Sequence, residues 1–109
     1  MRRWLRSGAN LVSRVGFSPQ ARRDLDEIAE YLVPRSPAAA IRFAEVVRDL
    51  AELLGRYPDL GAETRGERQA RSCLVPGFPY RLHYTARGGE LLVLHIRHTS
   101  RREWKGNED

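Results

Sequence analysis

The sequence predicts an α+β fold in which an N-terminal helical hairpin packs on a small, mainly antiparallel sheet of three to four strands. Three observations lead to this fold class. Apolar residues recur at helical spacing through residues 19–57, and from about residue 70 they alternate with polar ones. Ser-Pro pairs precede the helical part, and Pro-Gly and Gly-Gly pairs divide the alternating part into short strands. A length of 109 residues fits one domain.

Composition and charge narrow the class of protein. The chain is 41% hydrophobic and 30% charged, which is typical of soluble globular proteins and not of disordered or membrane proteins. Its formal net charge is +5, and arginine supplies 18 of its 19 cationic side chains, with Lys105 the one lysine. The single cysteine, Cys73, excludes an internal disulfide, and no Cys/His spacing matches a metal site. We expect a cytoplasmic protein that needs no metal or cofactor and does not associate with membranes.

Residues 1–14 form a basic extension ahead of a domain that we place at residues 15–105. The extension contains no acid and carries the arginines Arg2, Arg3, Arg6 and Arg14. Because Arg6 directly follows Trp4 and Leu5, the uninterrupted apolar stretch of an export signal is missing. A loose solvated extension and a functional basic arm are both compatible with this composition.

Two helices are predicted from the same start signal. Ser18-Pro19 and Ser36-Pro37 each offer a serine N-cap followed by proline at the first helical position. The first helix ends before Pro34, and its apolar positions are Ala21, Leu25, Ile28, Ala29 and Leu32. The second ends near Gly55 and Pro58, and its apolar stripe comprises Ala39, Phe43, Val46, Leu50, Leu53, Leu54 and Tyr57. The short connection predicts an antiparallel helical hairpin.

The apolar stripe of the second helix is wide for so small a sheet. We therefore expect part of it to stay exposed until an amphipathic partner covers it. An acidic segment of that partner would also meet the arginine-rich surface. The acidic side chains of the first helix are interpreted as a solvated helix face, and they are Asp24, Asp26, Glu27 and Glu30.

Strands are predicted after residue 70. In one, Tyr80, Leu82 and Tyr84 alternate with polar residues, and in the next the alternating apolar residues are Leu92, Leu94 and Ile96. A further strand, from about Arg71 to Val75, is expected to pair with the first of these across Pro76-Gly77. Leu11 to Phe17 is a weaker candidate for a fourth strand. Cys73 lies in an alternating segment and is interpreted as a packing residue.

The register of the last two strands depends on the loop between them. A three-residue loop, Arg87–Gly89, places Tyr84 opposite Leu92, Leu82 opposite Leu94 and Tyr80 opposite Ile96, which makes one face wholly apolar. A four-residue loop would mix charged and apolar side chains on that face. We therefore expect the three-residue loop, with the helices covering the apolar face and the other face left open.

The open face carries the one group of side chains that points to chemistry, namely Arg81, His83, His95 and Arg97. In the expected register Arg81 lies across from His95 and His83 across from Val93. Arginine can hold a phosphate in bidentate fashion and histidine titrates near neutral pH, so the group suits metal-free RNA cleavage. A solvated face whose long side chains limit edge-to-edge association explains the same residues at least as well.

The run from Ile96 to Trp104 closes the sheet with three arginines and an aromatic residue. Arginine contacts to phosphate and indole contacts to bases are one interpretation. Docking of a protein partner is another, because arginine and tryptophan are enriched at interface hot spots. His98 falls on the apolar face or just past its end, where a structural hydrogen bond is expected. No phosphate-binding loop, nucleophile elbow or zinc-binding helix motif is present in the sequence.

Several local sequences, in their order and spacing, resemble the ParE/RelE superfamily of toxins from bacterial type II toxin–antitoxin modules. They are Phe17–Ala21 leading into Asp24–Tyr31, then Tyr57–Gly61, Tyr80–Tyr84 and Ile96–Arg102. The resemblance covers roughly residues 15–104. It implies a helical hairpin on a small antiparallel sheet, growth arrest by the protein, and neutralisation by a cognate antitoxin in a toxin–antitoxin hetero-oligomer.

The resemblance leaves two targets open. Members similar to RelE are ribosome-dependent mRNA endoribonucleases, and for that branch the resemblance implies catalytic roles for Arg71, Arg81 and Arg101, with His83 or His95 moving a proton. Members similar to ParE inhibit DNA gyrase and have no established catalytic site. The candidates for binding the target or the antitoxin are Arg97, His98, Arg101, Arg102 and Trp104.

Departures from the nuclease pattern favour the ParE-like branch. Cys73 stands where that pattern has a second lysine, and Trp104 only approximately replaces its C-terminal tyrosine or histidine–tyrosine pair. The even helical hairpin and the Tyr57–Gly61 turn are also more ParE-like. We therefore expect a gyrase-inhibiting toxin. An mRNA endoribonuclease is the alternative, and a non-toxic basic nucleic-acid-binding module is the third interpretation.

Overall fold

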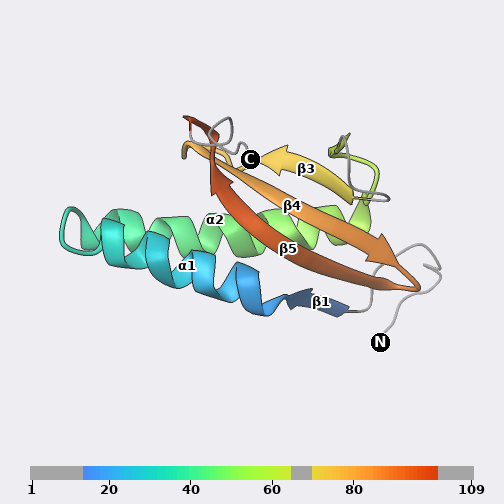
Figure 1. Ribbon diagram of the computed structural model, residues 1–109, viewed down its shortest axis with the longest axis horizontal. Helices are drawn as coiled ribbons and strands as arrows, with labels where there is room; N and C mark the ends of the chain where they lie inside the picture. The colour runs from blue at the N-terminus through green and yellow to red at the C-terminus, as the bar shows by residue number, and fades with distance from the viewer. Residues whose placement is uncertain (1–13, 65–69, 101–109) are drawn as a thin grey trace.

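Helices and sheet follow one another as predicted. The computed structural model describes residues 14–64 and 70–100. Strand β1 (Arg14–Phe17) precedes helices α1 (Pro19–Leu32) and α2 (Pro37–Arg56), and four strands follow: β2 (Ala62–Glu63), β3 (Ala70–Leu74), β4 (Tyr80–Arg87) and β5 (Glu90–His98). The two helices run side by side along the long axis of the molecule, and the strands cross them obliquely (Figure 1). This confirms the α+β fold class.

Among the described residues the sheet contains five strands in the order β1-β5-β4-β3-β2, more than the three to four expected. The two-residue strand β2 was not predicted, because so short a segment carries no readable alternation. β1 pairs parallel to β5, which makes the sheet mixed. It forms the end of the weaker candidate strand at 11–17, whose first residues lie outside the described part of the chain. Arg14, which we assigned to the basic extension, begins β1 and pairs with Glu90.

Both helices begin at the predicted caps. The Ser18 hydroxyl accepts a hydrogen bond from the Ala21 amide (3.0 Å), and the Ser36 hydroxyl accepts one from the Ala39 amide (3.1 Å). Each bond satisfies an amide that has no partner within its helix. The Ser-Pro signal thus places both helix starts.

The β4–β5 register differs from the prediction. The turn contains only Gly88 and Gly89, so Arg87 lies opposite Glu90 and Tyr84 opposite Val93. The two glycines have φ values of 59° and 81°, and a two-residue turn with positive φ at both positions matches the twist of the flanking strands better than a longer loop. The expected three-residue loop is therefore wrong.

A β-bulge then shifts the register once more. The ladder is irregular between His83 and Tyr84, and past this point His83 pairs with His95, which leaves Leu94 as the extra residue on β5. As a result Val93 and Ile96 both face the helices and are buried. Leu92, expected in the core, is 39% exposed. Leu94 is only half-buried.

The core lies between the helices and one face of the sheet, which we call the covered face. It is formed by Ala21, Ile28, Phe43, Val47, Leu50, Ala51, Leu54, Val75, Leu82, Tyr84, Leu91, Val93 and Ile96. Cys73 packs against this cluster, which confirms its interpretation as a packing residue. The other face of the sheet is the open face.

Helix α1 is attached to β5 by polar contacts. The Ser18 hydroxyl donates to the Leu94 carbonyl at the bulge (2.6 Å), and the Asp24 carboxylate accepts from the Ile96 amide (2.8 Å). Asp24 therefore belongs to a half-buried contact with the sheet, and its interpretation as part of a solvated helix face is wrong.

Part of the α2 stripe remains exposed, as expected. Leu53 and Tyr57 are 39% and 58% exposed, whereas Leu50 and Leu54 are buried against the sheet. Across residues 14–64 and 70–100, neither helix is both long and apolar enough to cross a lipid bilayer.

Candidate functional site

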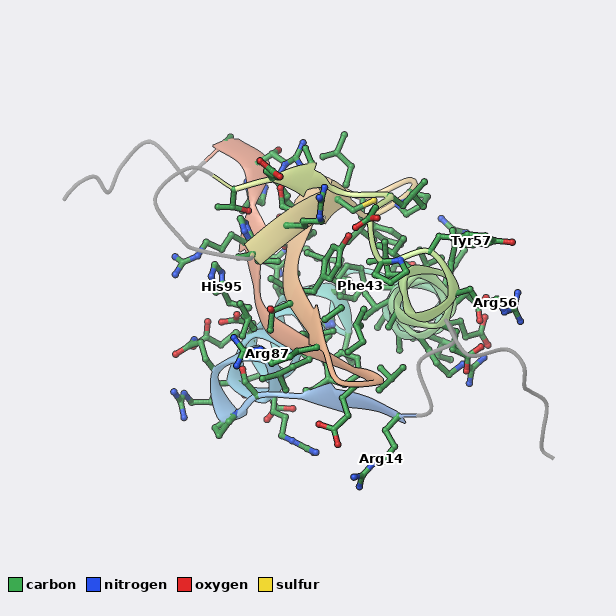
Figure 2. All side chains as sticks on the ribbon, turned by 90° about the vertical axis from the view of Figure 1, so that its right-hand side faces the viewer. Arg14, Phe43, Arg56, Tyr57, Arg87 and His95 are labelled. Atoms are coloured by element: carbon green, nitrogen blue, oxygen red, sulfur yellow. The ribbon has the colours of Figure 1, made fainter. Side chains whose placement is uncertain are left out.

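Four side chains from two strands meet on the open face, and we call them the arginine–histidine cluster: Arg81 and His83 from β4, His95 and Arg97 from β5. Arg81 lies opposite Arg97 and His83 opposite His95. The two imidazole rings stack with centroids 4.4 Å apart and an angle of 22° between their planes. Figure 2 shows His95 on the side of the strands away from Phe43 and α2. The structure thus brings the predicted residues together, with cross-strand partners that differ from those expected.

Two hydrogen bonds orient the arginines of this cluster. The Arg97 Nε donates to His95 Nδ1 (2.8 Å), and one Arg81 terminal nitrogen donates to the Ser72 hydroxyl of β3 (2.8 Å). Because a guanidinium can only donate, His95 Nδ1 must be the acceptor, and the proton of the neutral ring is on Nε2. Arg97 therefore selects the tautomer of His95.

His83 is the electrostatically unusual member of the cluster. Burial, together with smaller contributions from His95, Arg97 and Arg81 that repel the charged ring, lowers its pKa from 6.5 to about 4. Its Nδ1 is buried and has no hydrogen-bond partner among the described residues. His83 is therefore neutral at neutral pH and lacks the imidazolium form that acts as a general acid.

Arg71 is not part of this cluster. In β3 it lies opposite Tyr84, whereas its neighbour Ser72 lies opposite His83, so Arg71 projects from the covered face. It donates to the Gly61 carbonyl (2.7 Å) and lies 3.5 Å from the Glu63 carboxylate. The resemblance implied catalytic roles for both Arg71 and Arg81, yet the strand alternation places the two arginines on opposite faces of the sheet.

The segment that Arg71 contacts is also held by a buried tyrosine, Tyr84, whose place in the strand alternation indicated only an apolar core residue. The Tyr84 hydroxyl donates to the Pro58 carbonyl (2.6 Å) and accepts from the Gly61 amide (3.0 Å). Burial raises the pKa of Tyr84, so it stays a neutral donor. A Cβ at Gly61 would lie 2.7 Å from both the Ser72 carbonyl oxygen and the Tyr84 hydroxyl, so only glycine fits here.

The end of β5 carries the last described candidate. His98 Nδ1 accepts from the Ser100 amide (3.1 Å), and its ring packs edge-on against Tyr80 with centroids 5.1 Å apart. This confirms the expected structural hydrogen bond of His98. Three further candidates, Arg101, Arg102 and Trp104, lie outside the described residues.

A groove of about 490 Å³ lies between α1 and the end of β5. Its apolar lining includes Ile28 and Phe78, and charged residues on its rim include Glu27 and Arg97. β1 pairs with β5 only as far as Val93, so the outer edge of β5 beyond that residue has no strand partner among residues 14–64 and 70–100. Arg97 reaches both this groove and the arginine–histidine cluster.

The family model described as ParE toxin of type II toxin-antitoxin system, parDE, matches residues 15–103. The chain belongs to the ParE toxin family. It is also 30% identical over 91 residues to Toxin RelE3 of Caulobacter vibrioides, a match that covers 84% of this chain and 99% of the relative. The protein is therefore a type II toxin–antitoxin toxin of the ParE/RelE group.

Solved structures share the fold of this ParE toxin. A chain described as the chromosomal ParDE TA system from P. aeruginosa superposes with a TM-score of 0.67 at 19% identity and covers 80% of this chain and 96% of the other. A chain of the toxin-antitoxin complex RelBE2 from Mycobacterium tuberculosis superposes with a TM-score of 0.52 at 28% identity and covers 81% and 92%. The helical hairpin and the mixed sheet are thus the shared fold.

In this ParE toxin the described residues contain no group of three His, Cys, Asp or Glu side chains able to hold a metal ion. The polar groups that do converge are basic. Of the two histidines, His83 is held neutral by its surroundings at neutral pH.

Proposed function

We propose that this ParE toxin arrests growth by binding a DNA gyrase-like topoisomerase, and that a cognate antitoxin neutralises it. The observation that carries the proposal is the position of Arg71. The nuclease hypothesis requires Arg71 and Arg81 to hold one scissile phosphate, yet the two project from opposite faces of the sheet. A protein-binding toxin has no such requirement.

The state of His83 supports the same conclusion. Its pKa of about 4 leaves it uncharged at neutral pH, so in the protein without a bound anion it is not ready to protonate the leaving oxygen of an RNA cleavage. His95 is limited differently, because its Nδ1 accepts from Arg97. The cluster as it stands is better suited to binding than to proton transfer.

The antitoxin surface is proposed to include the exposed part of α2. Leu53 and Tyr57 lie one helical turn apart and are both exposed, which matches the apolar anchors that an amphipathic partner covers. Leu53→Asp is expected to weaken the complex with the neighbouring gene product at least tenfold in a pull-down or calorimetric titration. Glu52→Gln, an exposed neighbour on the same helix, is the control, and equal weakening by both variants would contradict this assignment.

The test of the main proposal is a supercoiling assay. Purified toxin in stoichiometric excess should block supercoiling by gyrase and produce DNA breaks, and added antitoxin should restore supercoiling. Unchanged supercoiling would contradict the proposed target.

A ribosome-dependent endoribonuclease is the second candidate, because Arg81 does lie with two histidines on an open face and the relative is named RelE3. Arg81→Ala should then abolish cleavage of translated mRNA and toxicity while the melting temperature changes little. Survival of toxicity in this variant would exclude the nuclease mechanism.

A further inference from the structure

We propose that the arginine–histidine cluster binds a phosphate group, and that the bound anion brings a proton onto the His83–His95 pair. The inference rests on the four side chains alone and is independent of whether gyrase or mRNA is the target. It assigns to the open face a ligand class, a tetrahedral oxyanion, and a change of protonation state that accompanies binding.

Arg81 and Arg97 place two positive charges close together on the open face. Arg81 and Arg97 lie directly opposite each other on neighbouring strands, a placement that destabilises a sheet unless the charges are neutralised. Neither makes an ion pair with a described residue, whereas Arg14 at the other end of the same face pairs with Glu90 at 2.8 Å. A bound anion would neutralise the two charges together.

Hydrogen bonds within the protein orient the guanidinium groups of Arg81 and Arg97. Arg97 uses Nε to reach His95, and Arg81 uses one terminal nitrogen to reach Ser72. Each bond fixes the plane of its guanidinium and leaves other donors for a ligand. Two guanidinium groups held in this way match the oxygens of a phosphate, which arginine binds as a rigid fork.

The surroundings of His83 determine whether its ring can take up a proton. The groups that act on His83 are Arg81 on its own strand and His95 and Arg97 on β5, and all disfavour a charged ring. From β3, the opposite residue is the uncharged Ser72. An anion within about 4–6 Å favours the charged ring and raises such a pKa by about 1–3 units. The His83 Nδ1, buried without a partner, would then carry a proton.

The experiment uses sulfate as the probe, because sulfate has the shape of phosphate but does not itself titrate near neutral pH. Binding to the full chain is measured by calorimetry at pH 5.5 in two buffers of different ionisation enthalpy. We expect uptake of about a fifth of a proton or more per sulfate, from the pKa increase above. Long-range ¹H–¹⁵N spectra should assign that proton to a ring of the His83–His95 pair and not to His98.

Variants test the composition of the site. Arg97→Gln and Arg81→Gln are each expected to weaken sulfate binding about tenfold, the loss of one charge-assisted hydrogen bond. Arg48→Gln, an exposed arginine on α2, should change the affinity less than twofold. Because Arg97 is exposed, its variant is not expected to disturb folding, and it should also alter the tautomer of His95.

The source of the phosphate is distinguished by two further probes, inorganic phosphate and a short single-stranded oligonucleotide without terminal phosphates. Binding of both that is lost in Arg97→Gln supports the site and indicates a nucleic-acid backbone. Binding of inorganic phosphate alone supports it and indicates a free phosphate. Sulfate binding without proton uptake, binding unchanged in Arg97→Gln, or no binding would overturn the proposal. None of these results bears on the gyrase assay.

Discussion

The two faces of the sheet use the same strands for different purposes. On the covered face, side chains are fixed against the helices or the 57–61 turn, and even the charged Arg71 serves as an anchor. On the open face, the arginines and histidines of the cluster contact one another, and neither Arg81 nor Arg97 has an ion pair with a described residue. Stability is therefore expected to depend mainly on the covered face and chemistry on the open face, and the following substitutions test this division.

The largest expected effect is in the core. Leu82 is fully buried on the covered face, whereas Leu74 is 53% exposed on the open face. Leu82→Ala should lower the free energy of unfolding by about 2–5 kcal/mol through lost burial and the cavity left behind. Leu74→Ala should cost less than about 0.5 kcal/mol, as is usual for exposed sites. Urea unfolding of both variants measures the difference, and equal losses would contradict the division.

A smaller effect is expected from a polar contact on the covered face. Tyr84→Phe removes the hydroxyl that bonds both Pro58 and Gly61 and should cost about 1–3 kcal/mol, because buried polar groups lose their partners. Tyr57→Phe is the matched control, since Tyr57 is 58% exposed. Thermal denaturation should separate the two, and a neutral Tyr84→Phe would mean that the turn is held by Arg71 alone.

On the open face, His83 makes the free energy of unfolding depend on pH. The unfolded chain protonates His83 near pH 6.5, whereas the folded chain resists protonation until about pH 4. Because the unfolded state binds more protons between these values, the free energy of unfolding falls as the pH is lowered through this window. The loss between pH 7 and 4.5 is up to about 2 kcal/mol. His83→Gln should flatten this part of the pH profile, and an unchanged profile would show that His83 is not desolvated.

The smallest effect is expected where α1 joins β5. Asp24→Asn keeps an acceptor for the Ile96 amide but loses the charge, at a cost of about 1 kcal/mol. Asp26→Asn, on the exposed side of α1, should be neutral within about 0.5 kcal/mol. If the two variants have equal unfolding free energies in urea, the contact between Asp24 and β5 contributes nothing to stability.

Helix starts and the two pairs of cluster residues within each strand could be predicted from the sequence, because both depend on local spacing. Ser18 and Ser36 cap the two helices, and each cap can be recognised from its own sequence segment. Arg81 and His83 share a face whatever their partner strand does, since residues two apart on a strand point the same way. His95 and Arg97 follow the same rule.

The pairing of β4 with β5 was predicted wrongly for two reasons. The Gly88-Gly89 pair favours a two-residue turn, but the expectation of a wholly apolar face led to a three-residue loop. The bulge at Leu94, which the residue pattern does not encode, then places His95 opposite His83 and Arg97 opposite Arg81. The role of Arg71 was missed for a similar reason. Its partners at positions 59–63 come from a turn and from the two-residue strand β2, whose position follows only from the folded sheet.

Strand order also affects how the protein folds during its synthesis. Of the described strands, β1 is synthesised first and its one neighbour, β5, is synthesised last, and Ser18 and its partner Leu94 are 76 residues apart. Contacts at such separation form slowly, because a long loop must be closed before they contribute. The start of α1 therefore has no sheet to dock on during translation. The growing chain can complete the toxin fold only after β5 has been synthesised.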